Sequence, residues 1–321
     1  MPHLISWTVM ALACVSITAH AQTFPTKPVR YIVPFPAGAS PDLIARLITE
    51  RFSKMWGQQV LVDNRSGAGG TVGAAVAAKG PADGYTLFQC NIASSAIATS
   101  LYAKMPYDHQ RDFAPISRIG TSPSVLVVHP SFPPRTLKEF IAYARARPSQ
   151  LSYGTSAAGT SPQLAIELLK LTAKIDVVHV PYKGAPQALN DVIGGQIPIT
   201  GQTAPAVLPV IQSGRVRAIA LTSLKRIPQL PSVPTMDEAG LPGFDVTSWY
   251  GLCAPAGTPT PILDKVHADL MTVLRLPEIQ QRLQDMVVTI APTSPQEFAQ
   301  FIRGETERWA KVIKAAGIPQ E

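Results

Sequence analysis

The chain has 321 residues, of which 46% are hydrophobic and 15% are charged, and its formal net charge is +7. This composition excludes a disordered or low-complexity protein, and the length suffices for about two globular domains. The basic residues form no Lys/Arg run and are not interleaved with aromatic residues. This argues against nucleic-acid binding and favours a field that attracts small anions.

The first 21 residues are predicted to form a secretory signal peptide. Residues 4–18 make an uncharged, mostly apolar run, and Ala19-His20-Ala21 has the small-x-small pattern of a cleavage site. No Lys or Arg precedes the run, which departs from the usual signal. The run is too short for a comfortable membrane span, and no other segment is long and apolar enough. We therefore expect cleavage after Ala21 and a mature protein that is soluble outside the cytoplasm.

From residue 29 onward, short β-rich runs alternate with helical periods. The expected strands are 29–35, 58–63 and 85–90, and the expected helices are 41–55 and 71–78, with a glycine-rich turn at 66–70. This alternation is typical of a parallel α/β sheet.

A second α/β series begins at residue 125. The expected strands are 125–130, 151–155, 176–180, 197–200 and 216–222, and the expected helices are 136–147, one from 162, and 185–193. A Pro-rich crossing at 227–244 precedes a strand at 246–255 and helices near 261–274, 277–286 and 295–316. Capping boxes are predicted at Thr136 with Glu139 and at Ser294 with Glu297.

The pattern predicts two α/β lobes. The first lobe is expected at 22–124 and the second at 125–224, while residues 225–321 cross back and complete the first lobe with C-terminal helices. The chain would pass between the lobes near 115–128 and again near 222–248.

Two helix starts have nearly the same sequence, AGASPDLIARLI at 37–48 and AGTSPQLAIELL at 158–169. Unpaired N–H groups and a partial positive charge let such a start hold an anion. One start in each lobe predicts that an anionic solute is held between them. Each contains a glycine for a tight turn, a serine expected at the N-cap and a proline expected at the first helical position: Gly38, Ser40 and Pro41, and Gly159, Ser161 and Pro162.

Catalytic and metal-binding patterns are absent from the sequence. There is no Gly-x-Ser-x-Gly elbow, and the histidines at 109, 129, 179 and 267 are not at metal-ligand spacing. The glycines of SGAGGTVGAA (66–75) do not follow G-x-G-x-x-G, which favours a backbone anion nest over a nucleotide site. We therefore expect no enzyme activity, no cofactor and no metal.

Three further side chains were candidates for chemistry. Asp42, near a helix start, is expected to interact with the helix dipole rather than act as a base. Cys90 and Cys253 each fall in an expected strand. An oxidising compartment would allow them to pair, but buried free thiols are the favoured interpretation.

Seven segments in order along the mature chain carry a family resemblance: KPVRYIVPFPAG (27–38) with Asp42, NRSGAGGTVGA (64–74), DGYTL (83–87), HVPYKG (179–184), GGQ (194–196), PSVPTMDEAGLPGF (231–244) and WYGLCAPAGTP (249–259). With them the chain resembles the Bug family, the periplasmic solute-binding receptors of tripartite tricarboxylate transporters. The resemblance implies a two-lobed periplasmic-binding-protein fold, type II-like, with a ligand cleft between the lobes. It also implies a monomer that captures a small organic carboxylate and delivers it to membrane permease subunits.

The resemblance further implies a set of ligand contacts, with Lys183 holding either the ligand or the hinge. These are Phe35, Ala37, Gly38, Ala39, Ser40, Asp42, Gly69, Gly70, Asn91, Ser94, Ser95, Ser156, Ala157, Gly159, Thr160, Lys183 and Gln202.

Four positions depart from the family pattern. Ala39 replaces a second glycine and is expected to narrow backbone freedom, Gln163 stands where many relatives have His, and Gly201-Gln202 replaces a common Phe-Asp pair. Losing that acidic side chain favours a carboxylate without an amino group, an aromatic acid being one candidate. An exported enzyme, which would need a histidine near Ser94 or Ser156, and a ligand-responsive sensor remain the alternatives.

Overall fold

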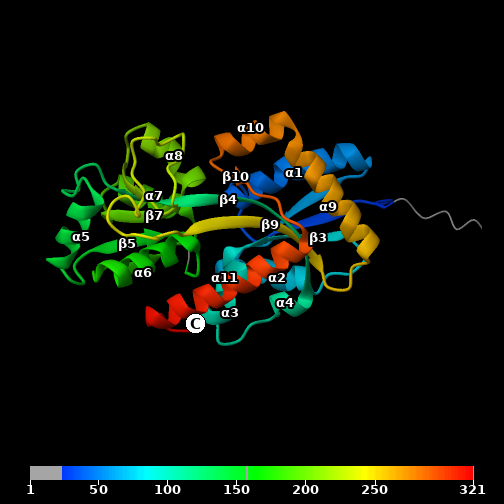
Figure 1. Ribbon diagram of the computed structural model, residues 1–321, viewed down its shortest axis with the longest axis horizontal. Coiled ribbons are helices and arrows are strands. Elements are labelled where there is room, and N and C mark those ends of the chain that lie inside the picture. Colours follow the sequence, from blue (N-terminus) through cyan, green and yellow to red (C-terminus); the bar gives the residue numbers. More distant parts are fainter. Residues whose placement is uncertain (1–23, 157, 321) are drawn as a thin grey trace, which may run out of the picture.

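The computed structural model describes residues 24–156 and 158–320 of the chain. The signal peptide expected at 1–21 lies outside the described residues. Two α/β lobes lie side by side, and two long strands run across the middle from one lobe into the other (Figure 1).

The first lobe contains the parallel strands that the sequence predicts. Its sheet follows the order β2-β1-β3-β9, with β1 parallel to β2 and β3, and with β9 antiparallel to β3. The apolar positions of α1, Ile44, Ile48 and Phe52, pack into a core with β1 because they recur at helical spacing. The bounds are β1 (Val29–Val33), α1 (Ser40–Trp56), β2 (Val60–Asn64), η1 (Ala68–Gly70), α2 (Thr71–Ala78), β3 (Thr86–Asn91), the π-helix η2 (Ala93–Ile97), α3 (Ala98–Leu101) and α4 (His109–Asp112).

The second lobe repeats the arrangement on a smaller sheet. Here β5 lies between β6 and β7, parallel to both, and β7 pairs with the far end of β4. The Pro-containing helix α8 was not predicted from the sequence. The bounds are α5 (Leu137–Arg145), β5 (Ser152–Thr155), α6 (Ser161–Ala173), β6 (Val178–Pro181), α7 (Ala185–Ile193), β7 (Ile199–Thr203), α8 (Ala204–Gln212) and β8 (Arg217–Leu221).

Strands β4 (Phe113–Val128) and β9 (Thr247–Pro255) connect the lobes. β4 is a single strand of 16 residues, so the strand expected at 125–130 begins 12 positions earlier. Pro115 and Pro123 obscure it in the sequence because proline interrupts a strand pattern. In the structure, register shifts after Pro115 and Arg118 accommodate the pairing of β4 with β9.

The C-terminal helices return to the first lobe. They are α9 (Thr260–Arg275), α10 (Pro277–Asp285), with the short strand β10 (Thr289–Ile290), and α11 (Pro295–Ala315). The capping box of Ser294 and Glu297 is confirmed at the start of α11. At α5 only half of the predicted box forms, because the Glu139 carboxylate accepts from the N–H of Arg135 instead of that of Thr136. None of the helices in the described part of the chain is long and apolar enough to cross a membrane.

The expectation of free thiols at Cys90 and Cys253 is wrong. The two residues form a disulfide between β3 and β9, 163 positions apart in sequence, with their Cα atoms 6.0 Å apart. The reason is the strand pairing: β3 and β9 are antiparallel neighbours, and Cys90 lies opposite Gly251, two residues from Cys253. The sequence does not reveal this adjacency, because the whole second lobe intervenes.

The disulfide makes a measurable contribution to stability. Replacing both cysteines with serine should lower the free energy of unfolding by about 2–4 kcal/mol, because the unfolded chain regains the freedom that the closed loop removes. Urea unfolding of the variant and of the oxidised protein measures the difference. Thiol titration of the unfolded oxidised protein should detect no thiol from either cysteine, and two reactive thiols there would contradict the bridge.

Candidate functional site

Both repeated helix starts face one cavity of about 840 Å³ between the lobes. Residues 38–41 line it from the first lobe and residues 160–162 from the second. The lobes also meet directly here, since the hydroxyls of Ser40 and Thr203 are 3.5 Å apart. The expected arrangement of two helix starts across one cleft is therefore present.

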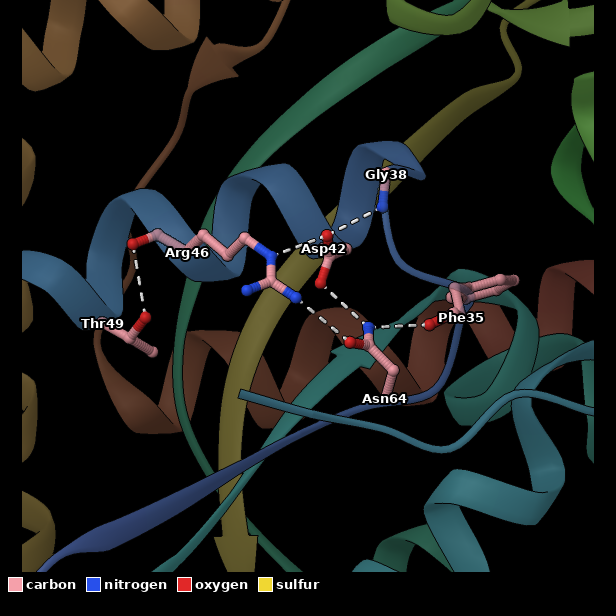
Figure 2. A network of polar contacts seen from close by, with 6 residues as sticks. All are labelled: Phe35, Gly38, Asp42, Arg46, Thr49 and Asn64. Carbon is pink, nitrogen blue, oxygen red and sulfur yellow. Dashed lines mark hydrogen bonds and ion pairs between the residues drawn. The ribbon is translucent and has the colours of Figure 1, made fainter. Parts of the chain in front are cut away.

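The loop before the first helix start is fixed by the carboxylate of Asp42, in the first turn of α1 (Figure 2). The N–H of Gly38 donates to Asp42 Oδ2 at 2.8 Å, and Arg46 Nε donates to the same oxygen at 2.9 Å. Asn64 Nδ2 donates both to Asp42 Oδ1, at 2.9 Å, and to the carbonyl of Phe35, at 3.0 Å. The network fixes the loop that leads from β1 into α1.

The carboxylate of Asp42 is buried and ionised. Burial alone would raise the pKa of Asp42, but its three hydrogen-bond donors outweigh burial and hold the pKa below the usual value. The side chain is 1% exposed and does not line the cavity. Asp42 thus positions the loop behind the cavity wall, in addition to its expected place near the helix dipole.

The second helix start uses an amide in the same position. Gln163 corresponds to Asp42 in the repeated sequence, and its Oε1 accepts from the N–H of Gly159 at 2.6 Å. Because Oε1 is the acceptor, Nε2 of Gln163 is the donor to Nδ1 of His179, 3.4 Å away. The remaining ring nitrogen of His179 bonds Thr155 Oγ1 at 2.7 Å. Burial lowers the pKa of His179 to about 4, so the ring is neutral at pH 7.

The predicted capping geometry is wrong at both starts. Ala39 and Thr160 occupy the N-cap positions, so Ser40 and Ser161 are already the first helical residues and the prolines are second. The backbone of Ala39, at φ −71° and ψ 157°, is open to any residue. Alanine at position 39 therefore has no conformational cost relative to glycine, contrary to the expectation that it narrows the freedom of the backbone.

The glycine before each N-cap does need its conformational freedom. Gly38 and Gly159 have φ of +80° and +71°, values that disfavour a side chain. A Cβ at Gly159 would also lie 2.5 Å from Leu101 Cδ2, whereas one at Gly38 would meet nothing within 4 Å. A substitution at Gly38 thus perturbs the loop alone, and one at Gly159 also disturbs packing between the lobes.

Residues 248–250 of β9 form one wall of the cavity. Trp249 and Tyr250 line it and are 1% and 3% exposed. The indole N–H of Trp249 donates to Glu305 Oε2 on α11 at 3.2 Å, and its ring packs edge-on against Phe298. Helix α11 therefore holds this wall in place.

The cavity surface carries little charge. Among the described residues that line it, Lys183 is the one charged side chain, and it lies exposed at the start of α7. Unpaired first-turn N–H groups of α1 and α6 add partial positive charge from opposite sides. The site thus offers donors and positive potential to a ligand, with apolar surface from Phe35 and Leu43, which line the cavity without being buried.

Residues 44–318 match the sequence profile of the family described as the tripartite tricarboxylate transporter family receptor, TctC. BugT from Bordetella pertussis is 35% identical over 309 residues, which cover 96% of this chain and 95% of that protein. The chain belongs to this receptor family. The resemblance to the Bug family seen in the sequence is thereby confirmed.

Two solved structures are similar to the receptor over most of its length. An R. palustris protein with adipate has a TM-score of 0.89 and 37% identity, covering 93% of this chain and 100% of that one. MatC from Rhodopseudomonas palustris with bound malate has a TM-score of 0.84 and 33% identity, covering 90% of this chain and 100% of that one. These likenesses confirm the two-lobed binding-protein fold predicted from the sequence.

Most residues expected at the receptor's site do line the cavity, while Asp42 and three others lie behind its wall. Ser94 and Ser95 are buried in η2, and Gly159 is covered by Leu101. Ala157 lies outside the described residues. The expected residues that line the cavity are Phe35, Ala37, Gly38, Ala39, Ser40, Gly69, Gly70, Asn91, Ser156, Thr160, Lys183 and Gln202.

Sequence reasoning missed several cavity-lining residues of the receptor. Trp249 and Tyr250 had a signal, because they open the segment WYGLCAPAGTP, but they were read only as a strand. The others follow from loop geometry that no motif reports. The missed residues include Tyr102, Tyr182, Thr203, Ser248, Trp249 and Tyr250.

None of the receptor's described histidines is hydrogen-bonded to a candidate serine, and the ring nitrogens of His109 are buried without a partner. No described hydrogen bond joins a histidine to Ser94 or Ser156: His179 bonds Thr155 and Gln163, and Ser94 Oγ accepts from Asn91. His129 does bond Ser131, but neither lines the cavity. The described residues also contain no cluster of three or more potential metal ligands.

Charge at Asp42 should stabilise the receptor in a pH-dependent way. Asp42→Asn should lower the free energy of unfolding by about 1–3 kcal/mol at pH 7, because a buried charged acceptor is lost. The pKa of Asp42 is lowered by folding, so its contribution is complete above the unfolded value of about 3.9 and is lost progressively as the pH falls from that value through the lower pKa of the folded state.

The difference between wild type and Asp42→Asn should therefore shrink below about pH 4. Glu50→Gln is the matched control, since Glu50 pairs with Lys54 at the same spacing on α1 but in solvent; it should leave stability unchanged. Equal effects of the two substitutions in urea unfolding would contradict the role of Asp42.

Proposed function

We propose that this receptor captures a small organic carboxylate without an amino group and hands it unchanged to a membrane permease. The observation that carries the proposal is the pair of helix starts on opposite sides of one cavity. Relatives with 37% and 33% identity were solved with adipate and with malate, which are carboxylates. The ligand-contact residues are proposed to be the expected ones that line the cavity.

The charge distribution supports a carboxylate as the ligand. Lys183 and the two helix starts attract an anion, and the described lining residues include no Asp or Glu to balance a ligand ammonium group. Apolar surface from Phe35 and Leu43 accommodates the body of the ligand. These features favour a carboxylate over an amino acid.

The helix starts do not suffice for binding. Each contributes ~0.3–2 kcal/mol to holding an anion, whereas micromolar affinity requires about 8 kcal/mol. The difference is assigned to the hydroxyls of Ser40, Ser156 and Ser161 at the cavity wall, to Lys183, and to exclusion of water by the two lobes.

The cellular setting is proposed from the sequence and the family. A signal peptide at 1–21 would place the mature protein in the periplasm, and the disulfide between Cys90 and Cys253 suits that oxidising compartment. The partners are proposed to be the transporter's membrane permease subunits, and the receptor is proposed to act as a monomer without catalysis or cofactor.

A ligand panel tests the carboxylate. Mono-, di- and tricarboxylates, aromatic acids and acidic amino acids are screened by thermal shift at millimolar concentration. A carboxylate without an amino group should raise the melting temperature, since a ligand bound only by the folded state stabilises it. Recovery of that ligand unchanged is expected, and a panel without any shift would refute the proposal.

Lys183 provides a second test. Lys183→Gln should weaken binding of the best carboxylate about fivefold or more at low salt, because a cation facing an anionic ligand is removed. The affinity of the variant should also depend less on ionic strength. Lys138→Gln, an exposed lysine on α5 outside the cavity, is the control. Equal affinities for both variants by titration calorimetry would exclude Lys183 from the site.

A further inference from the structure

Gln202 lies at the carboxyl end of β7, where this strand reaches the cavity. The residue lines the cavity, but only 1% of its surface is exposed. Its side chain lies on the same face of β7 as that of Thr200, two residues earlier, because side chains alternate along a strand.

The hydrogen bonds of Thr200 determine the orientation of the Gln202 amide. Thr200 Oγ1 is fully buried and donates its single proton to a backbone carbonyl, with Gly154 O at 2.8 Å and Gly201 O at 3.5 Å. It must therefore accept from Gln202, whose Nε2 lies 2.9 Å away. A reversed amide would place two acceptors against each other without a proton between them.

This orientation leaves the Gln202 carbonyl oxygen as an acceptor for a ligand. Within the described residues Oε1 has no hydrogen-bond partner. Unlike the buried side-chain atoms that lack a partner, it is not fully enclosed by protein. The small exposed area of Gln202 is consistent with an oxygen that opens to the cavity. An acceptor in this place requires a donor on the ligand.

We propose that Gln202 selects a hydroxylated carboxylate by accepting a hydrogen bond from the ligand's hydroxyl group through Oε1. The inference rests on the proposed function, because it names the subclass of carboxylate that the same cavity takes. A hydroxyl fits better than an ammonium group, since the oxygen is neutral and the described lining residues supply no negative charge. The carboxylate itself faces the helix starts and Lys183.

Pairs of acids that differ only by one hydroxyl group test the inference. The probes are succinate and malate, glutarate and 2-hydroxyglutarate, and phenylacetate and mandelate, with both enantiomers of each hydroxy acid, measured by titration calorimetry at pH 7.5. In at least one pair the hydroxy acid should bind about tenfold more tightly, the effect of one additional hydrogen bond at a desolvated site.

Two variants separate the acceptor from its support. Gln202→Leu should weaken the hydroxy acid about tenfold and change its partner acid less than about twofold, because the acceptor is removed without adding charge. Thr200→Val frees the amide to rotate and should also reduce the preference while the partner acid still binds. Gln196→Leu, at an exposed glutamine outside the cavity, should keep the preference unchanged.

The outcomes are distinguishable. Equal binding of both acids in every pair, or a preference that persists in Gln202→Leu, would overturn the role of Gln202 while leaving the carboxylate receptor intact. Absence of binding for every acid of the three pairs in the wild-type protein would overturn the carboxylate function and this inference with it.

Discussion

The geometry of the cavity depends on one type of hydrogen bond that occurs twice. In each case a glycine N–H donates to a side chain in the first turn of the helix that follows. Gly38 donates to Asp42 in the first lobe, and Gly159 donates to Gln163 in the second. Each bond occupies the glycine N–H that precedes the helix and so fixes the loop that places the helix start at the cavity. The ligand-facing loops are thus fixed by side chains that no ligand would touch.

The two copies differ in charge and in what supports them. Asp42 is an anion surrounded by Arg46, Asn64 and the backbone, so part of the positive end of α1 is already neutralised within the protein. Gln163 is neutral and rests on the neutral ring of His179, so α6 keeps its full partial charge. Of the two helix starts, the one in the second lobe, at α6, therefore has the stronger positive potential.

The sequence predicted the order of most helices and strands, because their apolar periodicities are strong and their breaks fall at glycine and proline. It failed where distant pairing or local competition decided the outcome. α8 was missed because Pro205 and Pro209 argue against a helix, although the first occupies an early position that needs no N–H. The serine N-caps were wrong because both helices begin one residue earlier than expected, with Ala39 and Thr160 at the N-cap positions.

The site was predictable to a similar degree. Motifs rich in glycine and small residues correctly marked the loops at the cavity. Asp42 and Gly159, however, could not be separated from true lining residues, because the sequence does not show which side of a loop faces the cavity. Trp249 and Tyr250 stood in a recognised segment, but their place at the cavity depends on β9 crossing beside β3 and β4. A one-dimensional pattern contains no information on that crossing.

The bridge between Cys90 and Cys253 has a topological consequence for the second lobe. Every residue of β5, β6, β7 and β8 lies between the two cysteines, so this lobe belongs to a covalent ring that is closed inside the first lobe. If the second lobe opened by itself, its ends would stay together, and much of the loop-closure entropy would already be spent before it refolded. The second lobe is thus covalently tethered at its base, and its unfolding cannot carry the two connecting strands far apart.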